Sequence, residues 1–453
     1  MIDLQNIRQN NWANTRVSIL GAGMSGMATA NLGRYVGADI FISDKNNSPE
    51  IMEKLCEFHH ETGKHSEKML NTDLLIISPG IPDSIPIIQK CREGNIPIVS
   101  EIEFASWFTE SPILALTGSN GKTSTKELLL HVLSNQYDVH ATEGNFNTSI
   151  GLPLTLLLLD KTNTISILEM GANQVGDIEY LCNIANPTHG LITNIAPAHL
   201  SGFGTIDAIA KTKGALFQSL ENGTSFMNYA DERIANMQIP GEKVTYGLNA
   251  DCDFPVDIHH ENDGSLTLTI DTHEIRTGSQ NLSYARNTLA VAAIAVTLGI
   301  DWNDLQEKIL SFSPPPGRCQ IKQYNSITVI DDTYNANLES SLAALDYLKA
   351  FSGNGRRVFV FGDMFELGES SQQQHEKVGH KCSESELDAV YTIGDESIIT
   401  NSVLQNVPVQ AHFRIPDELI TTLRNDLHNG DKVLFKGSRG MAMERIIEGV
   451  FLN

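Results

Sequence analysis

The stretch ILALTGSNGKTS, residues 113–124, decides how the central part of the chain folds. Four apolar residues, 113–116, predict a buried strand, and a turn bounded by Gly118 and Gly121 follows it. The next residues begin a helix with apolar positions at Leu128, Leu129, Val132 and Leu133. Such a strand, loop and helix bind phosphate, because glycines let backbone N–H groups approach phosphate oxygens and a helix N-terminus favours negative charge.

Lys122 and Thr123 indicate what this loop binds. A lysine at this position reaches the terminal phosphates of a nucleotide, and a hydroxyl beside it can hold Mg²⁺. The spacing is G-x-x-G-K-T, two residues shorter than the common phosphate-binding pattern. The alternative, an ordinary glycine turn before a helix, does not account for the Lys-Thr pair. We call residues 118–124 the phosphate loop and predict that ATP contacts Gly118, Ser119, Asn120, Gly121, Lys122, Thr123 and Ser124.

Length and charge narrow the class of protein. A chain of 453 residues is too long for one core and predicts about three domains. Its net charge of −23 disfavours nucleic acid and anionic lipid as partners, although a basic pocket could still bind a small anion. Residues 1–16 show no apolar signal core, and no apolar run approaches a membrane span. Six scattered cysteines without a C-x-x-C pair fit reduced thiols, so we expect a cytoplasmic protein.

The first hundred residues alternate strand and helix signals, which predicts a parallel, doubly wound sheet. The strand at 17–20 opens into GAGMSG, residues 21–26, which we call the N-terminal glycine loop. Its G-x-G-x-x-G spacing, with Asp44 at the end of the next strand, is typical of NAD binding. A sugar linked to UDP also offers a pyrophosphate, so NAD and a UDP-sugar both remain open here. The other strands are predicted at 40–44, 74–80 and 96–100.

Two further stretches of the chain also alternate strand and helix signals. Residues 222–275 are rich in polar and β-forming residues and predict an antiparallel excursion, and residues 289–300 predict a helix ending at Gly299. The proline-rich stretch at 313–318 predicts a domain boundary. We therefore predict three α/β domains, at 1–110, 111–314 and 315–453. Further strands are predicted at 164–170, 190–195, 327–332, 357–364, 389–395 and 432–438.

Three residues in the central domain are candidates for phosphoryl chemistry. Glu169 ends a predicted strand, where a carboxylate could ligate Mg²⁺ or could be a solvated loop residue. His199 follows another strand, and Lys213 lies on a predicted helix. Taken singly, a structural histidine and a surface lysine are the simpler interpretations. Together with the phosphate loop, the three residues favour a catalytic site.

A set of longer motifs gives the chain a resemblance to the Mur ligase family. These motifs are TGSNGKTSTKE (117–127), TEGNFNTSIGLPLTLL (142–157), LEMGANQVGDI (168–178), NIAPAHLSGFGTIDAIAKTKG (194–214), PPGR (315–318), IDDTYNAN (330–337), FGDMFELG (361–368) and KGSRGMAME (436–444). The resemblance implies an N-terminal Rossmann-like UDP-binding domain, a central P-loop ATPase domain and a C-terminal Rossmann-like domain. It implies an ATP-dependent amide ligase of peptidoglycan precursor synthesis, expected to work as a monomer.

Two branches of the family are involved. The central and C-terminal motifs resemble the branch that joins D-Ala-D-Ala to UDP-N-acetylmuramoyl-tripeptide and releases ADP and phosphate. The motifs GAGMSGMA (21–28), ISPGIP (77–82) and SEIEFA (100–105) resemble the branch that adds D-glutamate to UDP-N-acetylmuramoyl-L-alanine. We infer the reaction from the motifs of the central and C-terminal domains, which indicate ligation of D-Ala-D-Ala. Ligation of D-glutamate is therefore the first alternative. An NAD-binding redox or sensor protein is an alternative of another class, and a non-catalytic scaffold is a third.

The resemblance assigns roles to the candidates. It makes Lys122 a phosphoryl stabiliser, Thr123 a ligand of one Mg²⁺, and Glu169 and His199 ligands of a second. It makes Lys213 a lysine carbamylated by CO₂, which would turn a cation into an anionic oxygen ligand. The catalytic residues are therefore predicted to be Lys122, Glu169, His199 and Lys213, and the metal ligands Thr123, Glu169, His199 and Lys213.

The resemblance also implies binding residues for each substrate. For ATP these are, beyond the phosphate loop, Asn287, Arg318 and Asp332. For the UDP-linked substrate they are Gly21, Gly23, Met24, Ser25, Gly26, Asp44, Ser78, Gly80, Asn145 and Asn147. For the amino substrate they are Asn335, Asn337, Asp363, Lys436 and Ser438. The sequence departs from the family pattern at Ser149, at Ser283 and Tyr284, and at Leu338, where a histidine, a His-Asn pair and a proline are usual.

Overall fold

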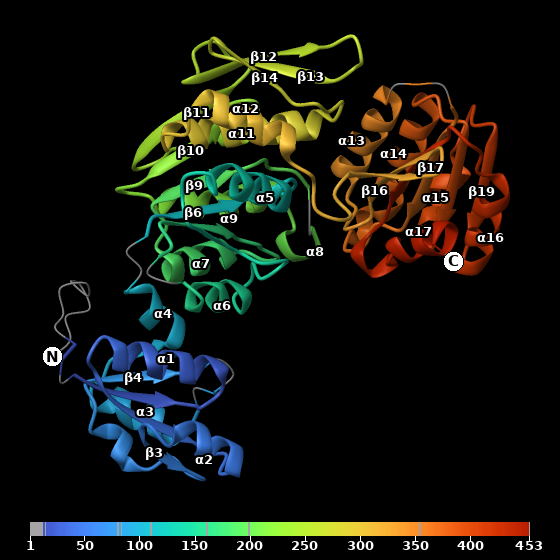
Figure 1. The fold of residues 1–453 in the computed structure, drawn as a ribbon. Coiled ribbons are helices and arrows are strands. Elements are labelled where there is room, and N and C mark those ends of the chain that lie inside the picture. The colour runs from blue at the N-terminus through green and yellow to red at the C-terminus, as the bar shows by residue number, and fades with distance from the viewer. Residues whose placement is uncertain are drawn as a thin grey trace. The chain divides into compact units, whose positions relative to one another are not determined.

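The computed structural model describes residues 12–13, 15–78, 81–82, 84–108, 111–159, 162–197, 200–351, 353 and 355–452. Three sheets, each with helices against it, carry the fold (Figure 1). The predicted class of three α/β domains with parallel sheets is confirmed. Among the described residues there is no helix with the length and apolarity that a membrane crossing needs.

The chain divides into two compact units. The first comprises Met1–Ile113, His140–Met170 and Glu179–Pro187. The second comprises Leu114–Val139, Gly171–Ile178 and Thr188–Asn453. The second unit therefore contains both the phosphate loop and everything beyond residue 188.

The N-terminal sheet has five strands in the order β3-β2-β1-β4-β5, and all of its strand pairs are parallel. Alternate residues of its central strands face two cores. Ile19 and Ile76 join one core, whereas Leu20 and Leu75 join the other, so both faces are covered. The elements are β1 (Arg16–Leu20), α1 (Met24–Tyr35), β2 (Asp39–Asp44), α2 (Pro49–Leu55), β3 (His59–Thr62), η2 (Glu67–Leu70), β4 (Leu74–Ile77), α3 (Pro86–Glu93), β5 (Ile98–Ser100) and α4 (Glu101–Ser106).

The second sheet has nine strands in the order β14-β13-β12-β11-β10-β9-β6-β8-β7. Strands β12, β13 and β14 pair antiparallel, as predicted for this part of residues 222–275. The prediction was wrong for β10 and β11, which pair parallel to each other and to their neighbours and so continue the parallel sheet. The elements are β6 (Ile113–Thr117), α5 (Lys122–Leu133), β7 (Val139–Ala141), α6 (Gly151–Leu157), β8 (Ile165–Glu169), α7 (Asp177–Ala185), β9 (His189–Ile192), α8 (Leu200–Phe203), α9 (Ile206–Gln218), β10 (Thr224–Asn228), α10 (Glu232–Ala235), β11 (Glu242–Gly247), β12 (Phe254–His260), β13 (Leu266–Ile270), β14 (His273–Arg276), α11 (Leu282–Thr297) and α12 (Trp302–Ser311).

The third sheet has six strands in the order β15-β16-β20-β17-β18-β19, of which only β15 runs antiparallel. Leu345 and Val378 pack on one face, and Leu423 and Ile446 pack on the other. The elements are β15 (Gln320–Tyr324), β16 (Ile327–Asp332), α13 (Leu338–Ala350), β17 (Arg357–Gly362), η3 (Gly368–Ser370), α14 (Ser371–Glu384), β18 (Ala389–Ile393), α15 (Ser397–Ser402), β19 (Val409–Phe413), α16 (Pro416–Asp426), β20 (Lys432–Lys436), η4 (Arg439–Met441) and α17 (Glu444–Phe451).

Candidate active site

The phosphate loop has the backbone shape that its glycines predict. Gly118 and Gly121 adopt φ of 153° and 79°, in the region that L side chains rarely enter. Strand β6 before the loop is fully buried, and α5 begins at Lys122 without a side-chain cap. An uncapped helix N-terminus next to a glycine turn is suited to an anionic ligand.

The segment after β9 holds the first half of this loop. The Ser119 N–H donates to the carbonyl of Asn194 at 3.0 Å, and the Asn120 N–H donates to the Asn194 side chain at 2.8 Å. The Thr193 hydroxyl donates to the Asn120 carbonyl at 2.6 Å. Because these N–H groups are engaged, the phosphate-binding groups must come from the second half, around the start of α5. The motif NIAP marked this segment, but sequence reasoning missed its support of the loop.

Lys122 and Thr123 both have partners inside the second unit. The Lys122 ammonium donates to the carbonyl of Gly118 at 2.9 Å, folding back over the loop. The Arg318 guanidinium donates to the Thr123 hydroxyl at 3.1 Å and lies 3.8 Å from the ring centroid of Tyr334. The linker arginine therefore contacts the residue predicted to hold Mg²⁺.

Two further asparagines, Asn287 and Asn337, contact the loop. A side chain on Gly121 would come within 3.0 Å of the Asn287 amide oxygen, so Asn287 lies against the turn. Asn120 donates to the Glu339 carboxylate at 2.6 Å and accepts from the Asn337 amide at 2.8 Å. Asn337 also caps α13, since its side chain accepts from the Ser340 N–H and the Ser340 hydroxyl accepts from the Asn337 N–H. Its sequence-predicted contact with the amino substrate would have to compete with both of these bonds.

Lys213 lies on α9 and is 3% exposed. Within the described part of the chain, its ammonium has no hydrogen bond or ion pair. Burial, and then the positive charge of Lys122, hold the pKa of the Lys213 ammonium well below its usual range. The neutral amine is the form that attacks CO₂, so the environment favours the modification that the sequence analysis expected.

Glu169 ends β8 in the first unit and is 1% exposed. One carboxylate oxygen accepts from the Asn147 amide at 2.8 Å, and the Glu169 N–H donates to the Thr142 hydroxyl at 3.0 Å. The other carboxylate oxygen is buried without a partner among the described residues. A buried, half-satisfied carboxylate fits the chemistry of a Mg²⁺ ligand. Within the described ranges, no three His, Cys, Asp or Glu side chains form a metal cluster by themselves.

The N-terminal glycine loop is built on tight backbone contacts. Gly21 adopts φ of 109°, and a side chain on Gly26 would lie 2.1 Å from the Gly21 carbonyl. The Asp44 carboxylate accepts from the Ala22 N–H at 2.6 Å, so it closes the loop. Gly23 and Met24 are exposed at the start of α1, whereas Ser25 and Ser78 hydrogen-bond to the buried Glu101. Asn145, in the loop before α6, is exposed.

The predicted amino-substrate residues meet at the end of the third sheet. The Lys436 ammonium lies 2.5 Å from the Asp332 carboxylate and 3.1 Å from the Asn335 carbonyl. Both oxygens of Asp363 accept backbone N–H bonds, from Asp395 and Ser397, and the Ser438 N–H donates to the Asp363 carbonyl. These contacts give Asp363 a structural role that the sequence analysis did not foresee.

Two predicted site residues, His199 and Gly80, lie outside the described residues. Apart from Asn145, the remaining predicted residues fall into four groups: the phosphate loop with Lys213, Asn287 and Arg318; Glu169 with Asn147; the N-terminal glycine loop with Asp44 and Ser78; and the end of the third sheet with Asp332, Asn335, Asn337, Asp363, Lys436 and Ser438. Sequence reasoning missed Tyr334 and Glu339, which contact Arg318 and Asn120. Their position inside and just after the IDDTYNAN motif was the available signal.

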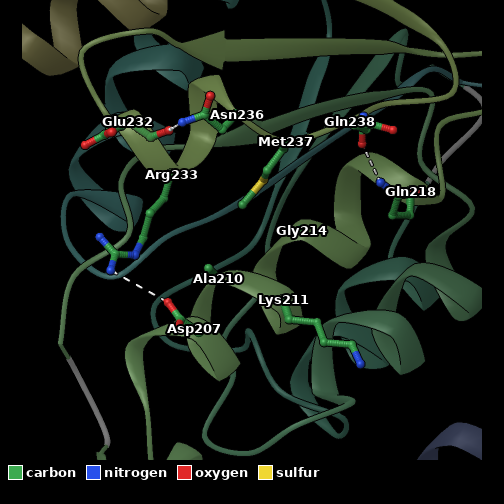
Figure 2. Close-up of a pocket in the computed structure, with 10 residues that line it drawn as sticks. All are labelled: Asp207, Ala210, Lys211, Gly214, Gln218, Glu232, Arg233, Asn236, Met237 and Gln238. Atoms are coloured by element: carbon green, nitrogen blue, oxygen red, sulfur yellow. Dashed lines mark hydrogen bonds and ion pairs between the residues drawn. The ribbon is translucent and has the colours of Figure 1, made fainter.

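The structure also has a surface cavity of about 610 Å³ (Figure 2). Helices α9 and α10 and the residues after α10 line it. Asp207 and Arg233 form an ion pair at 3.7 Å across it, and the Gln218 amide donates to the Gln238 carbonyl at 2.6 Å. No predicted site residue lines this cavity, and its mixed charges indicate no single ligand.

Comparisons with known families cover most of the chain. Residues 15–100 match the description "Mur ligase MurD-like, N-terminal domain". Residues 116–295 match "Mur ligase middle domain", and residues 317–439 match "Mur ligase, glutamate ligase domain".

Individual relatives of the chain are Mur ligases as well. A UDP-N-acetylmuramoyl-tripeptide–D-alanyl-D-alanine ligase of Haemophilus influenzae is 35% identical over 76% of this chain and 78% of its own length. An enzyme of the same name from Bacillus subtilis is 31% identical over 74% of this chain and 75% of its own length. The crystal structure of a MurF ligase from Thermotoga maritima in complex with ADP has a TM-score of 0.70 at 25% identity, covering 100% of this chain and 96% of that one.

Proposed function

We propose that this chain, which belongs to the Mur ligase family, joins D-Ala-D-Ala to UDP-N-acetylmuramoyl-tripeptide. It is an ATP-dependent, amide-bond-forming ligase of peptidoglycan precursor synthesis, and its products are the pentapeptide precursor, ADP and phosphate. The observation that carries this conclusion is the identity of 31–35% to several ligases of this name over three quarters of the chain.

D-Glutamate ligation is the one alternative that a specific observation favours. The N-terminal residues 15–100 match the MurD-like domain, which differs from the branch indicated by the rest of the chain. That domain is predicted to hold the UDP part of the substrate, and UDP is common to both reactions. The incoming amine would instead contact the C-terminal sheet, whose motifs resemble the D-Ala-D-Ala branch.

The chemistry follows from how poor an electrophile a carboxylate is. A carboxylate oxygen of the tripeptide attacks the γ-phosphorus of ATP, the bond to the β-phosphate oxygen breaks, and an acyl phosphate and ADP result. The neutral amine of D-Ala-D-Ala then attacks the acyl carbon, its nitrogen loses a proton to solvent, and the tetrahedral intermediate expels phosphate to leave the amide. Lys122 supplies positive charge to the transferring phosphoryl group, and Arg318 adds a second cation beside it.

Each unit contains an oxygen ligand suited to Mg²⁺, Glu169 in the first and Thr123 in the second. We assign one ion to the Thr123 hydroxyl and a second to Glu169, His199 and carbamylated Lys213. The buried, unpartnered oxygen of Glu169 supports the second assignment. When bound, Mg²⁺ would neutralise charge on the phosphoryl oxygens.

The carbamate on Lys213 rests on the burial of this lysine. A bare ammonium here would repel a metal ion, and the depressed pKa supplies the neutral amine that CO₂ requires. The N–C bond forms as the amine loses a proton, which leaves an anionic oxygen pair. We place the reaction in the cytoplasm, because ATP is supplied there and all six cysteines are free thiols.

A substrate-pair assay tests the function. The protein is incubated with ATP, Mg²⁺ and either UDP-N-acetylmuramoyl-tripeptide plus D-Ala-D-Ala, or UDP-N-acetylmuramoyl-L-alanine plus D-glutamate, and products are identified by mass. We expect the pentapeptide product in the first mixture and no product in the second. Product only in the second mixture would assign the chain to D-glutamate ligation.

A further inference from the structure

One arginine at the carboxyl edge of the third sheet has no role in the proposed reaction. Three cationic side chains follow the parallel strands at this edge: Lys436 and Arg439 at the end of β20, and Arg414 after β19. An incoming dipeptide carries a C-terminal carboxylate, which must be desolvated when it binds. A cation at this edge is therefore expected to receive it.

Two of the three cations are poorly suited to that task. Lys436 is 1% exposed and its charge is paired with Asp332 at 2.5 Å. Arg414 follows the edge strand β19, which β17 and β18 separate from β20, and it lies 3.8 Å from Asp395. Neither is both accessible and adjacent to the predicted amino-substrate residues.

Arg439 meets both conditions. Its side chain is 64% exposed, and the backbone N–H of Arg439 donates to the side-chain oxygen of Asn335 at 3.4 Å. One terminal nitrogen donates to Glu444 at 3.0 Å, and the guanidinium carbon lies 5.8 Å from the ring centroid of Tyr334. A guanidinium has five N–H donors, so the pair with Glu444 leaves enough for a bidentate carboxylate.

The surrounding loop presents apolar surface as well. Phe365 is 45% exposed, and its N–H donates to the Ser438 hydroxyl at 2.8 Å. A side chain on Gly440 would come within 2.8 Å of the Phe365 ring, so the ring lies directly against the loop. Ala442 ends the short turn that begins at Arg439, in the left-handed region at a φ of 47°. The loop that carries Arg439 therefore has two aromatic side chains near it, Tyr334 beside the guanidinium and Phe365 against Gly440.

We propose that Arg439 binds the C-terminal carboxylate of the incoming dipeptide, with the rings of Tyr334 and Phe365 beside its methyl groups. This assignment rests on the proposed function, because it takes D-Ala-D-Ala as the substrate. The carboxylate accepts two guanidinium N–H bonds and leaves the amino end of the dipeptide free to attack. Arg439 acts as a specificity residue, and its loss affects the amino substrate alone.

The test compares D-Ala-D-Ala with its C-terminal carboxamide, which keeps the shape and removes the charge. Wild type should prefer the carboxylate by about tenfold or more in kcat/KM, the factor expected for a charge-assisted hydrogen bond. Arg439→Gln should reduce this preference to about one while leaving the rate with the carboxamide and the KM for ATP unchanged. Arg414→Gln, at the same edge, should keep the wild-type preference.

The outcomes separate the two claims. An Arg439→Gln enzyme that still prefers the carboxylate by the wild-type factor overturns the assignment and leaves the proposed function intact. A wild type that does not turn over D-Ala-D-Ala at all overturns the proposed function, and this assignment with it. Because the carboxamide rate is measured on the same variant, a misfolded variant is recognised by its loss.

Discussion

The molecule contains two glycine loops that share a backbone plan and differ in the charges beneath them. Each follows a buried strand, has a glycine with positive φ, and precedes a helix without a side-chain cap, α1 or α5. The N-terminal glycine loop lies over Glu101, a buried acid whose pKa burial raises. The phosphate loop instead carries Lys122, with the buried base Lys213 close enough to be affected by its charge.

This difference separates binding from phosphoryl transfer. Backbone N–H groups alone suffice to hold a pyrophosphate, and both loops offer them. Only the phosphate loop adds cations that can stabilise a phosphoryl group during its transfer. A G-x-G-x-x-G or G-x-x-G-K-T spacing therefore fixes the loop's shape, whereas the ionisable residues around it fix its chemistry.

The largest effect should come from Lys122→Ala. Removing a cation aimed at the transferring phosphoryl group should lower the rate of substrate-dependent phosphate release about 10²–10³-fold. Affinity for the UDP-linked substrate, measured by calorimetry, should be unchanged because the other loop is intact. Lys243→Ala, an exposed lysine of the same unit, is the control. Full activity in Lys122→Ala would remove the phosphate loop from the chemistry.

Lys213→Ala should give the next largest loss, about 10²-fold in kcat, because the anionic oxygen ligand disappears. Short carboxylates such as acetate should restore part of the activity, since they can supply two carboxylate oxygens in the space that the Lys213 side chain leaves. Lys211→Ala, on the same helix but exposed, should behave as wild type. A Lys213→Ala enzyme that acetate leaves unchanged would argue against the carbamate.

An alanine substitution in either glycine loop should raise KM for only one of the two substrates, ATP or the UDP-linked substrate. Gly26→Ala places a side chain on the Gly21 carbonyl, and Gly118→Ala places one on the Thr193 hydroxyl, at a distorting cost of about 1–3 kcal/mol each. Gly26→Ala should raise KM for the UDP-linked substrate about tenfold and spare KM for ATP, and Gly118→Ala should do the reverse. If Gly26→Ala raised KM for ATP instead, the division of labour would be wrong.

Glu101→Gln should give the smallest effect, on stability. Burial raises the pKa of Glu101 in the folded protein, so the contribution of this carboxyl group to stability is present at acidic pH and is lost as pH rises through that pKa. Neutral glutamine removes the cost of a buried charge, so Tm at pH 8 should rise by about 2–4 °C, with little change at pH 4. An equal rise at both pH values would mean that packing, rather than charge, is responsible.

The buried central strands could be predicted from the sequence, whereas some edge strands of the sheets could not. The strands at 113–116, 357–364 and 432–438 were found because continuous apolar runs bounded by glycine leave few other structures. Strands β3, with the sequence HHET, and β15 were missed because edge strands carry polar residues on exposed positions. Helix α11 begins at Leu282, earlier than residue 289, because the Asn281 side chain caps it.

The candidate site shows the same limit. Motifs located the phosphate loop, Glu169 and Lys213, since chemistry constrains residue type at fixed spacing. The partners of these residues could not be predicted, because Thr193, Asn194 and Glu339 come from distant segments that only the fold brings to the loop. The saturation of Asp363 by backbone N–H groups was likewise invisible in the sequence.

The central claim is that the phosphate loop transfers the γ-phosphoryl group of ATP to a carboxylate of the UDP-linked substrate. Oxygen-18 in the terminal carboxyl group of UDP-N-acetylmuramoyl-tripeptide tests this directly, with D-Ala-D-Ala and ATP present and the released phosphate analysed by mass. We predict one labelled oxygen in each phosphate, because an acyl phosphate leaves with a carboxyl oxygen. Unlabelled phosphate, formed at the same rate as product, would contradict the account.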